Sequence, residues 1–117
     1  MADYLPIYKP GQAITLKASA AITGGQLVEV TGSGTVGPAG AASTKVVGVA
    51  GFTAAINDNV TIFTGGVQHA VAAGAITAGD VVQAGAAGTV ATGTTAPIGI
   101  ALADAADTAD ARILMNR

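Results

Sequence analysis

The chain has 117 residues with five basic and seven acidic side chains, a net charge of −2 and no cysteine. This length predicts one domain, the few scattered basic residues argue against nucleic acid as a partner, and the lack of cysteine excludes disulfides and thiolate metal sites. Half of the residues are hydrophobic, but only 3% are aromatic and 17 are glycine, so we expect a thin core that gains stability from self-association.

The first seventeen residues differ from the rest and hold both tyrosines. Two prolines fix φ and disfavour helix at the residues before them, which predicts an extended arm over residues 1–17. The arm either packs back on its own domain as an edge strand or binds another polypeptide, and the scarcity of large side chains elsewhere favours the second interpretation. The candidate binding residues are Tyr4, Leu5, Pro6, Ile7 and Tyr8. No signal peptide is predicted here, and no apolar stretch in the chain is long enough to predict a membrane span.

Residues 18–117 are predicted to form a single β domain made of two related halves, residues 18–66 and 71–116. The segment AITGGQLVEVTGSGTV from Ala21 aligns with AITAGDVVQAGAAGTV from Ala75 at a constant offset of 54. VVGVA from Val46 then aligns with PIGIA from Pro97 at an offset of 51, which indicates a deletion of three residues between the two blocks. Matches at Ile, Thr and Val positions are harder to obtain by chance than matches at Ala or Gly, so we interpret the pattern as an internal repeat.

Short strands are predicted within each half. Segments rich in Val, Ile and Thr are separated by turn-forming Gly, Asn and Asp. The predicted strands are residues 26–30, 46–50 and 60–63 in the first half, with their counterparts at 80–84, 97–101 and 111–114 in the second. The Ala-rich stretches 53–56 and 103–109 are compatible with a helical turn or a loop. The predicted fold class is therefore all-β.

Three features could carry chemistry, and each has a simpler structural interpretation. His69 is the only histidine, and no nucleophile stands at the spacing of a catalytic triad. Asp104, Asp107 and Asp110 do not have the spacing of a calcium-binding loop, which favours a solvated acidic loop. The Gly-rich run 32–40 lacks the ending of a phosphate-binding loop and is predicted to connect strands. We therefore expect that the protein is not an enzyme and that it binds no cofactor, no metal and no small-molecule substrate.

In their order along the chain, several segments resemble the small capsid decoration, or cement, proteins of tailed bacteriophages. These segments are the Tyr/Pro arm, AITGGQLVEV, KVVGVAGFTAAINDNVTIFTGGV, AITAGDVVQAG, APIGIALADA and the closing ARILMN. The resemblance implies a small β-clip-like partial barrel or sandwich, assembled as a homotrimer on the outer surface of the virion. Its partners would be the major capsid protein and further copies of itself. It would stabilise the head at subunit junctions by binding the assembled shell better than free subunits.

Two other classes of protein remain as alternatives. The turn at residues 76–79 also resembles that of ligand-binding, SAF-like β-clip modules associated with carbohydrate-handling enzymes. Such a module would need a concave polar pocket, and the sequence offers few convergent polar side chains for one. A tail or surface-fibre segment would show longer repeats or a coiled coil, and neither pattern is present in the sequence.

Overall fold

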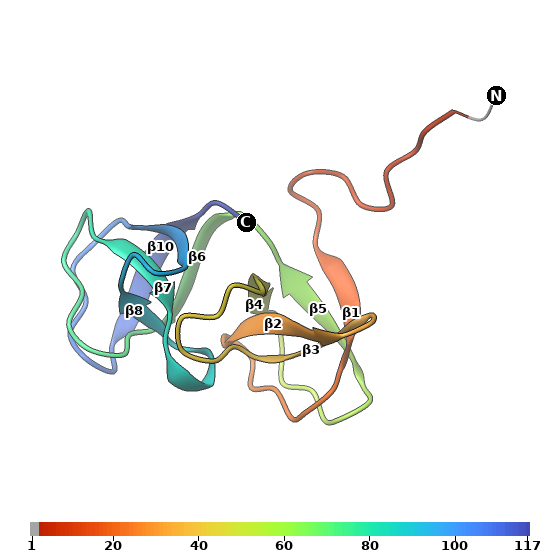
Figure 1. Cartoon of the computed structure of the whole chain (residues 1–117), viewed down its shortest axis with the longest axis horizontal. Coiled ribbons are helices and arrows are strands. Elements are labelled where there is room, and N and C mark those ends of the chain that lie inside the picture. Colours follow the sequence, from red (N-terminus) through yellow and green to blue (C-terminus); the bar gives the residue numbers. More distant parts are fainter. Residues whose placement is uncertain (1–2) are drawn as a thin grey trace.

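The structure is a computed structural model that describes residues 3–117 as ten strands and one short 3₁₀ turn (Figure 1). The strands are β1 (Ile14–Ala18), β2 (Leu27–Gly32), β3 (Thr35–Pro38), β4 (Val46–Ala50), β5 (Asn59–Phe63), β6 (Gly66–Val71), β7 (Val81–Ala84), β8 (Val90–Thr92), β9 (Pro97–Ala101) and β10 (Asp110–Met115), and the turn is η1 (Ala86–Gly88). The all-β prediction is confirmed. Within the described residues, no helix has the length and apolar character needed to cross a bilayer.

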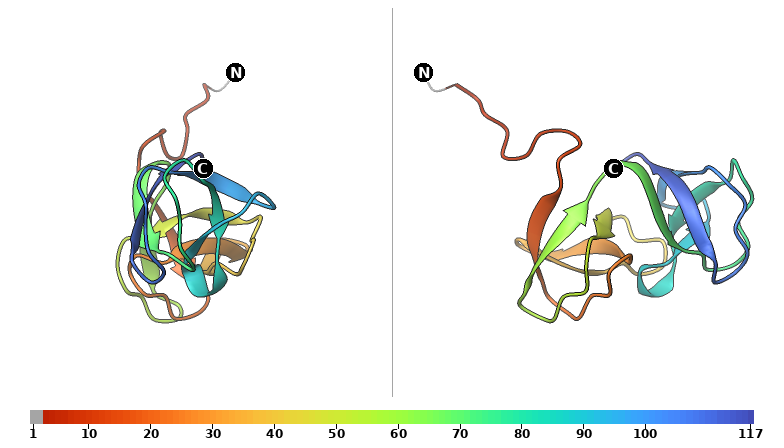
Figure 2. Two further views of the ribbon diagram at one scale, coloured as in Figure 1. Left: turned by 90° about the vertical axis from the view of Figure 1, so that its left-hand side faces the viewer. Right: turned by 180° about the vertical axis from the view of Figure 1, so that it is seen from behind.

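The ten strands form two units that lie side by side (Figures 1 and 2). The first unit is a closed barrel in the order β1-β3-β2-β4-β5, in which β5 pairs with β1. The second is a sheet in the order β6-β10-β9-β7-β8. A parallel bridge between Ala72, directly after β6, and Val90 of β8 joins the two edges of that sheet. We refer to the units as the first and second barrel.

The two barrels repeat one another strand by strand, which confirms the two related halves predicted from the sequence. An offset of 54 carries β1, β2 and β3 onto β6, β7 and β8, and an offset of 51 carries β4 and β5 onto β9 and β10. Isolated bridges obey the same offsets, because Ile22 bridges to Ala54 and Ile76 bridges to Ala105. The repeat therefore includes the pairing of the backbone as well as the sequence.

The first barrel begins earlier in the chain than the expected boundary at residue 17. Residues 14–17 belong to β1 and pair antiparallel with β5. At the offset of 54, ITLKA of β1 corresponds to QHAVA, and only the final alanine is identical, so the sequence repeat does not reveal this strand. The segment that precedes the barrel is therefore residues 3–13, and residues 1 and 2 of the expected arm lie outside the described part of the chain.

One further segment differs from what its composition indicated, and two others take one of the two forms that their composition allowed. The Gly-rich run 32–40, predicted as a connection, contains β3, which pairs with β2 in a hairpin. The Ala-rich stretches 53–56 and 103–109 form loops and not helical turns. In each of them an alanine makes a strand-like bridge to an isoleucine of its own barrel, and this tertiary pairing overrides the helix propensity of alanine.

The same close crossing of strands occurs in both barrels and requires glycine. Gly48 on β4 lies against the carbonyl oxygen of Phe63, and Gly99 on β9 lies against that of Leu114. A Cβ at either glycine would overlap the opposing carbonyl oxygen. These glycines let β4 and β9 pass directly over the neighbouring strand, next to the register shifts in the β2/β4 and β7/β9 pairs.

The core has two parts, and one of them joins the barrels. One cluster lies in the first barrel and includes Val28, Val60 and Ile62. The other contains Val82 and Ile113 of the second barrel together with four residues of the first half, which are Leu27, Ala39, Val46 and Val49. No polar or charged side chain is buried within residues 3–117. The first barrel therefore contributes one outer face to the core that it shares with the second barrel.

Candidate functional site

The residues predicted to bind a partner lie on the arm, which leaves the first barrel on the side away from the second (Figures 1 and 2). Tyr4, Leu5 and Ile7 are 85%, 82% and 92% exposed. No strand is formed by residues 3–13. Tyr8 is the least exposed of the large side chains, at 41%, and its hydroxyl accepts a hydrogen bond from the Thr15 amide at 3.4 Å. The arm thus extends its apolar side chains into solvent.

A turn at the base of the arm fixes where it leaves β1. The amide of Lys9 donates to Gln12 Oε1 at 2.8 Å, and the amide of Gln12 donates to the carbonyl of Lys9 at 3.0 Å. Gly11 supplies the positive φ, +82°, within this turn. Burying one large apolar side chain is worth about 1.5–3 kcal/mol. Contiguous exposed side chains of this kind therefore indicate an interaction surface.

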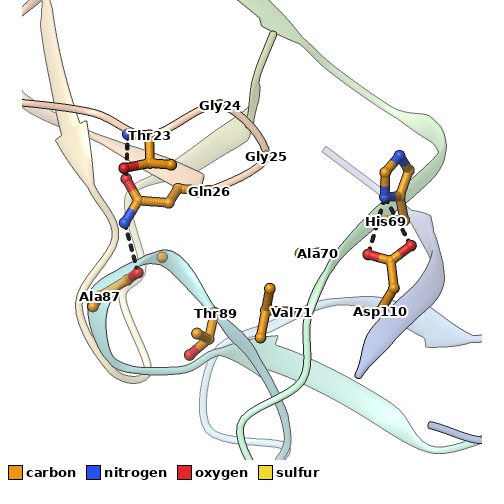
Figure 3. Close-up of a pocket in the computed structure, with 11 residues that line it drawn as sticks. Thr23, Gly24, Gly25, Gln26, His69, Ala70, Val71, Ala87, Thr89 and Asp110 are labelled. Atoms are coloured by element: carbon orange, nitrogen blue, oxygen red, sulfur yellow. Dashed lines mark hydrogen bonds and ion pairs between the residues drawn. The ribbon is translucent and has the colours of Figure 1, made fainter. Parts of the chain in front are cut away.

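A cavity of about 410 Å³ lies between the two barrels (Figure 3). Its walls come from residues 23–26 of the first barrel and from residues 69–71 and 87–89 of the second. Gln26 links the two sides, because its Nε2 donates to the carbonyl of Ala87 at 3.0 Å while its Oε1 accepts from the amide of Thr23 at 2.8 Å. The remaining wall is mostly apolar. The polar groups of Gln26 are thus engaged in holding the barrels together.

His69 lies on β6 at the rim of this cavity, beside Asp110 of β10 (Figure 3). Its Nδ1 is 3.0 Å from each carboxylate oxygen of Asp110. The two side chains are 71% and 66% exposed, and an ion pair at such an exposed position contributes little to stability. Within residues 3–117, the side chain of His69 makes no hydrogen bond to a hydroxyl group. The structure thus places His69 in a surface pair between neighbouring strands.

The three aspartates of the predicted acidic loop have separate partners. Asp104 accepts a hydrogen bond from the amide of Ala78 at 2.8 Å, and Asp107 accepts one from the amide of Gly74 at 2.8 Å. Asp110 pairs with the histidine of β6. No group of three or more potential metal ligands occurs in the described part of the chain. The carboxylates of Asp104 and Asp107 therefore hydrogen-bond the loop at residues 103–109 to the turns beside it.

The structure also exposes apolar side chains on the strands and on the loops beside them, which the sequence did not indicate. Members of this set are Phe52, Ile56, Phe63, Val67, Val71, Ile100, Leu102 and Leu114. Phe63 and Leu114 hold equivalent positions in the two barrels, and each is 47% exposed. The alternation of side chains along a strand shows which residues point outward. It does not reveal whether solvent or another surface covers them, so this set carried no signal in the sequence.

Comparison with known proteins finds similarity to a protein family and to solved structures. A family model for phage cement proteins matches residues 8–117. Among solved structures, the chain is similar to the head fiber gp8.5 N base of bacteriophage phi29, with a TM-score of 0.69 and 18% sequence identity over 90% of this chain and 93% of that one. At this identity the likeness shows a shared fold. No curated protein matches the chain.

Proposed function

The chain belongs to the phage cement protein family, whose role is structural and associated with the phage head, and we propose that it binds the outer surface of the assembled head where subunits of the major capsid protein meet. The observation that carries this proposal is the arm. Tyr4, Leu5 and Ile7 are more than four-fifths exposed, and a stretch of such side chains is stabilised by contact with a second surface. We propose that this surface belongs to the capsid.

The arm is suited to bind an extended groove or the edge of a sheet. Its backbone forms no strand within residues 3–13, so the part before the turn at residues 9–12 can pair through its amide and carbonyl groups with an edge strand. Pro6 and Pro10 restrict φ in the free arm, which lowers the conformational entropy that is lost on binding. Tyr4 and Tyr8 supply broad apolar surface with a polar end, and such side chains are enriched at interfaces.

The proposed mechanism is binding without a chemical step. A protein that binds the assembled shell and not its free subunits shifts assembly toward the shell, by about 2.7 kcal/mol per site at a free concentration of 100 Kd. We further propose that the protein acts as a homotrimer. Three arms on one particle raise the effective concentration of each arm, so weak individual contacts together give slow dissociation. The thin core, made of side chains no larger than Ile, Leu and Met, is consistent with stabilisation by self-association.

The test is co-sedimentation of the purified protein with phage heads that lack it. We expect saturable binding of the full chain and loss of binding when residues 1–10 are deleted, with the circular dichroism spectrum of a folded β protein retained. The matched point variants are Ile7→Ser, which should weaken binding, and Lys9→Ser, which should leave it nearly unchanged. Undiminished binding of the deleted chain would refute the role of the arm, and no binding of the full chain would refute the proposed function.

A further inference from the structure

We propose that a face of the second barrel receives a hairpin tip from the first barrel of another copy of this chain. The contact that joins the two barrels within one chain is the template for this contact between chains. The inference rests on the self-association in the proposed function and deepens it by assigning the two surfaces.

Within the chain, the first barrel receives the turn η1 of the second barrel. Gly88 donates its amide hydrogen to the carbonyl of Ala39 at 2.8 Å, and Gln26 Nε2 donates to the carbonyl of Ala87 at 3.0 Å. We call residues 84–88 the inner tip. The inner receiving face consists of Leu27, Val46 and Val49, which are 0%, 2% and 5% exposed and share a core cluster with the second barrel.

The second barrel carries the counterpart of this face, uncovered within the chain. We call it the outer receiving face, and it consists of Val81, Pro97 and Ile100. Ile100 is 47% exposed, whereas its counterpart Val49 is 5% exposed. Pro97 is exposed, whereas its counterpart Val46 is buried. A position that is buried in one barrel by contact with its neighbour is thus an exposed apolar surface in the other.

The first barrel carries the counterpart of the inner tip, and it is also uncovered. We call residues 30–34, at the turn between β2 and β3, the outer tip. Val30 is 38% exposed, whereas its counterpart Ala84 is 1% exposed. A single chain therefore holds one unpaired tip and one unpaired receiving face, on different barrels.

One glycine of the outer tip has the same backbone conformation as its counterpart in the inner tip, although the two turns differ, because Ala87 has φ +55° and its counterpart Ser33 has no positive φ. Gly34 has φ +72° and its counterpart Gly88 has φ +73°. A Cβ on Gly88 would lie 2.7 Å from Gln26 Cβ and 2.9 Å from the carbonyl oxygen of Leu27. A Cβ on Gly34 would meet nothing within 4 Å. Close packing at the inner tip leaves no room for a side chain at Gly88. The equivalent residue of the outer tip, Gly34, is also a glycine, although a side chain there would meet no neighbouring atom.

The polar pair at the contact changes in a complementary way. Asp80 replaces Gln26, and Ser33 replaces Ala87. A carboxylate cannot donate to a carbonyl as the glutamine amide does, but it can accept a hydrogen bond from a serine hydroxyl. Oδ2 of Asp80 already accepts from the amide of Thr77 at 2.9 Å, and the other carboxylate oxygen can accept from Ser33 of a second copy. This hydrogen bond would come from the Ser33 side chain, whereas the inner one goes to the main-chain carbonyl of Ala87, so the polar part of the two contacts differs in geometry.

One part of the inner contact has no counterpart. The amide of Ala42 donates to the carbonyl of Ala84 at 2.8 Å, and this loop of the first barrel is shortened by three residues in the second. The contact between chains is therefore smaller than the contact within a chain. Because the tip and the face are different surfaces, the contact is heterologous and forms a ring when the rotation closes. A trimer built in this way is a ring of six barrels.

The test uses the full-length chain and measures its mass by light scattering. We expect the wild type to be trimeric, and Val30→Glu on the outer tip or Ile100→Glu on the outer receiving face to reduce the mass to that of a monomer. Ile56→Glu replaces an isoleucine that is 59% exposed on a loop of the first barrel and should leave the trimer intact. An equimolar mixture of the two disruptive variants should form a dimer, because one intact tip and one intact face remain.

The inference is overturned if the wild type is monomeric at its highest soluble concentration, if both glutamate variants remain trimeric, or if their mixture stays monomeric. Circular dichroism must show that each variant is folded, and Val30→Ser and Ile100→Ser provide milder substitutions if a glutamate variant is not. Binding to heads is a separate measurement. Trimers that assemble as described but fail to bind heads would refute the proposed function and leave this inference standing.

Discussion

A methyl group added at Gly48 or Gly99 would occupy the position of a carbonyl oxygen on the opposing strand. Backbone atoms cannot move aside as a flexible side chain can, so we expect Gly48→Ala to lower the free energy of unfolding by about 1–3 kcal/mol. Urea unfolding followed by circular dichroism measures this loss. Gly40→Ala is the control, because its Cβ would lie at an ordinary 3.6 Å from Glu29 Oε1. Equal unfolding midpoints for the two variants would contradict the close crossing.

The carboxylate of Asp104 provides a second test at the scale of single residues. It accepts the amide hydrogen of Ala78 at 2.8 Å, and Thr53 makes the equivalent contact to Gly24 at 3.2 Å in the first barrel. Asp104→Ala should therefore destabilise the protein by about 1 kcal/mol in thermal or urea unfolding. Asp110→Ala removes only a surface pair and should change stability by less than that. A larger loss of stability for Asp110→Ala than for Asp104→Ala would contradict a stabilising role for the hydrogen bond of Asp104.

At this scale the sequence predicts an extended arm, with its end placed at residue 17 and not at residue 13, but not how individual side chains are covered. Leu27 and Val81 are both apolar residues at equivalent strand positions, yet the first is buried and the second is half-buried. The difference arises because the second barrel covers the face that contains Leu27, whereas no part of residues 3–117 covers the equivalent face at Val81. The burial of these side chains is decided by which barrel packs on which, and a local sequence pattern carries no information about that packing.

At the scale of elements, the contact between the barrels makes a matched pair of substitutions possible. Leu27 is fully buried where the barrels meet, so Leu27→Ala should cost about 2–5 kcal/mol. Val81→Ala removes side-chain atoms from the equivalent position on the outer receiving face and should cost about 1 kcal/mol or less in the monomer. Urea unfolding of both variants under the same conditions checks this. Similar losses of unfolding free energy in the two variants would mean that packing at the inner receiving face does not stabilise the chain.

The strands that the sequence predicts are those with the clearest pattern. VVGVA and PIGIA, in β4 and β9, are short runs rich in Val and Ile that recur at a fixed offset, and the structure has strands at those residues. β1 and β6 share almost no identity, and β3 lies in a Gly-rich run that indicates a connection. These strands are specified by their pairing partners more than by their own residues, because the propensity to form a strand depends strongly on context. Closure of the first barrel by β1 and β5 was therefore not predictable from local patterns.

At the scale of the whole molecule, duplication explains the arrangement of surfaces. Two copies of one barrel stand in a single chain, and the first covers its receiving face with the second. The arm, residues 3–13, has no arm-like counterpart in the repeat, since the equivalent residues 57–67 include β5 and the start of β6. The sequence predicted the duplication and the arm. The structure adds that the arm leaves the first barrel on the side away from the second barrel (Figure 1). The arm and the outer tip both belong to the first barrel, and the tip lies beside β1, since the amide of Lys17 donates to the carbonyl of Gly34 at 3.2 Å.

Heating of phage heads tests the stabilising role at the same scale. Binding that favours the assembled shell raises the temperature at which the head opens. We expect heads supplied with the full chain to release their DNA at a higher temperature than bare heads, as followed by a dye that fluoresces on free DNA. Heads supplied with the chain lacking residues 1–10 should behave as bare heads. An equal release temperature for bare heads and heads saturated with the full chain would contradict a stabilising function.

The most direct test of the central claim is an electron cryo-microscopy map of heads saturated with the purified protein. We predict density for the paired barrels on the outer surface above the junctions between capsid subunits, with density for residues 3–8 lying along the capsid protein. Bare junctions, or barrels bound only away from them, would contradict the account.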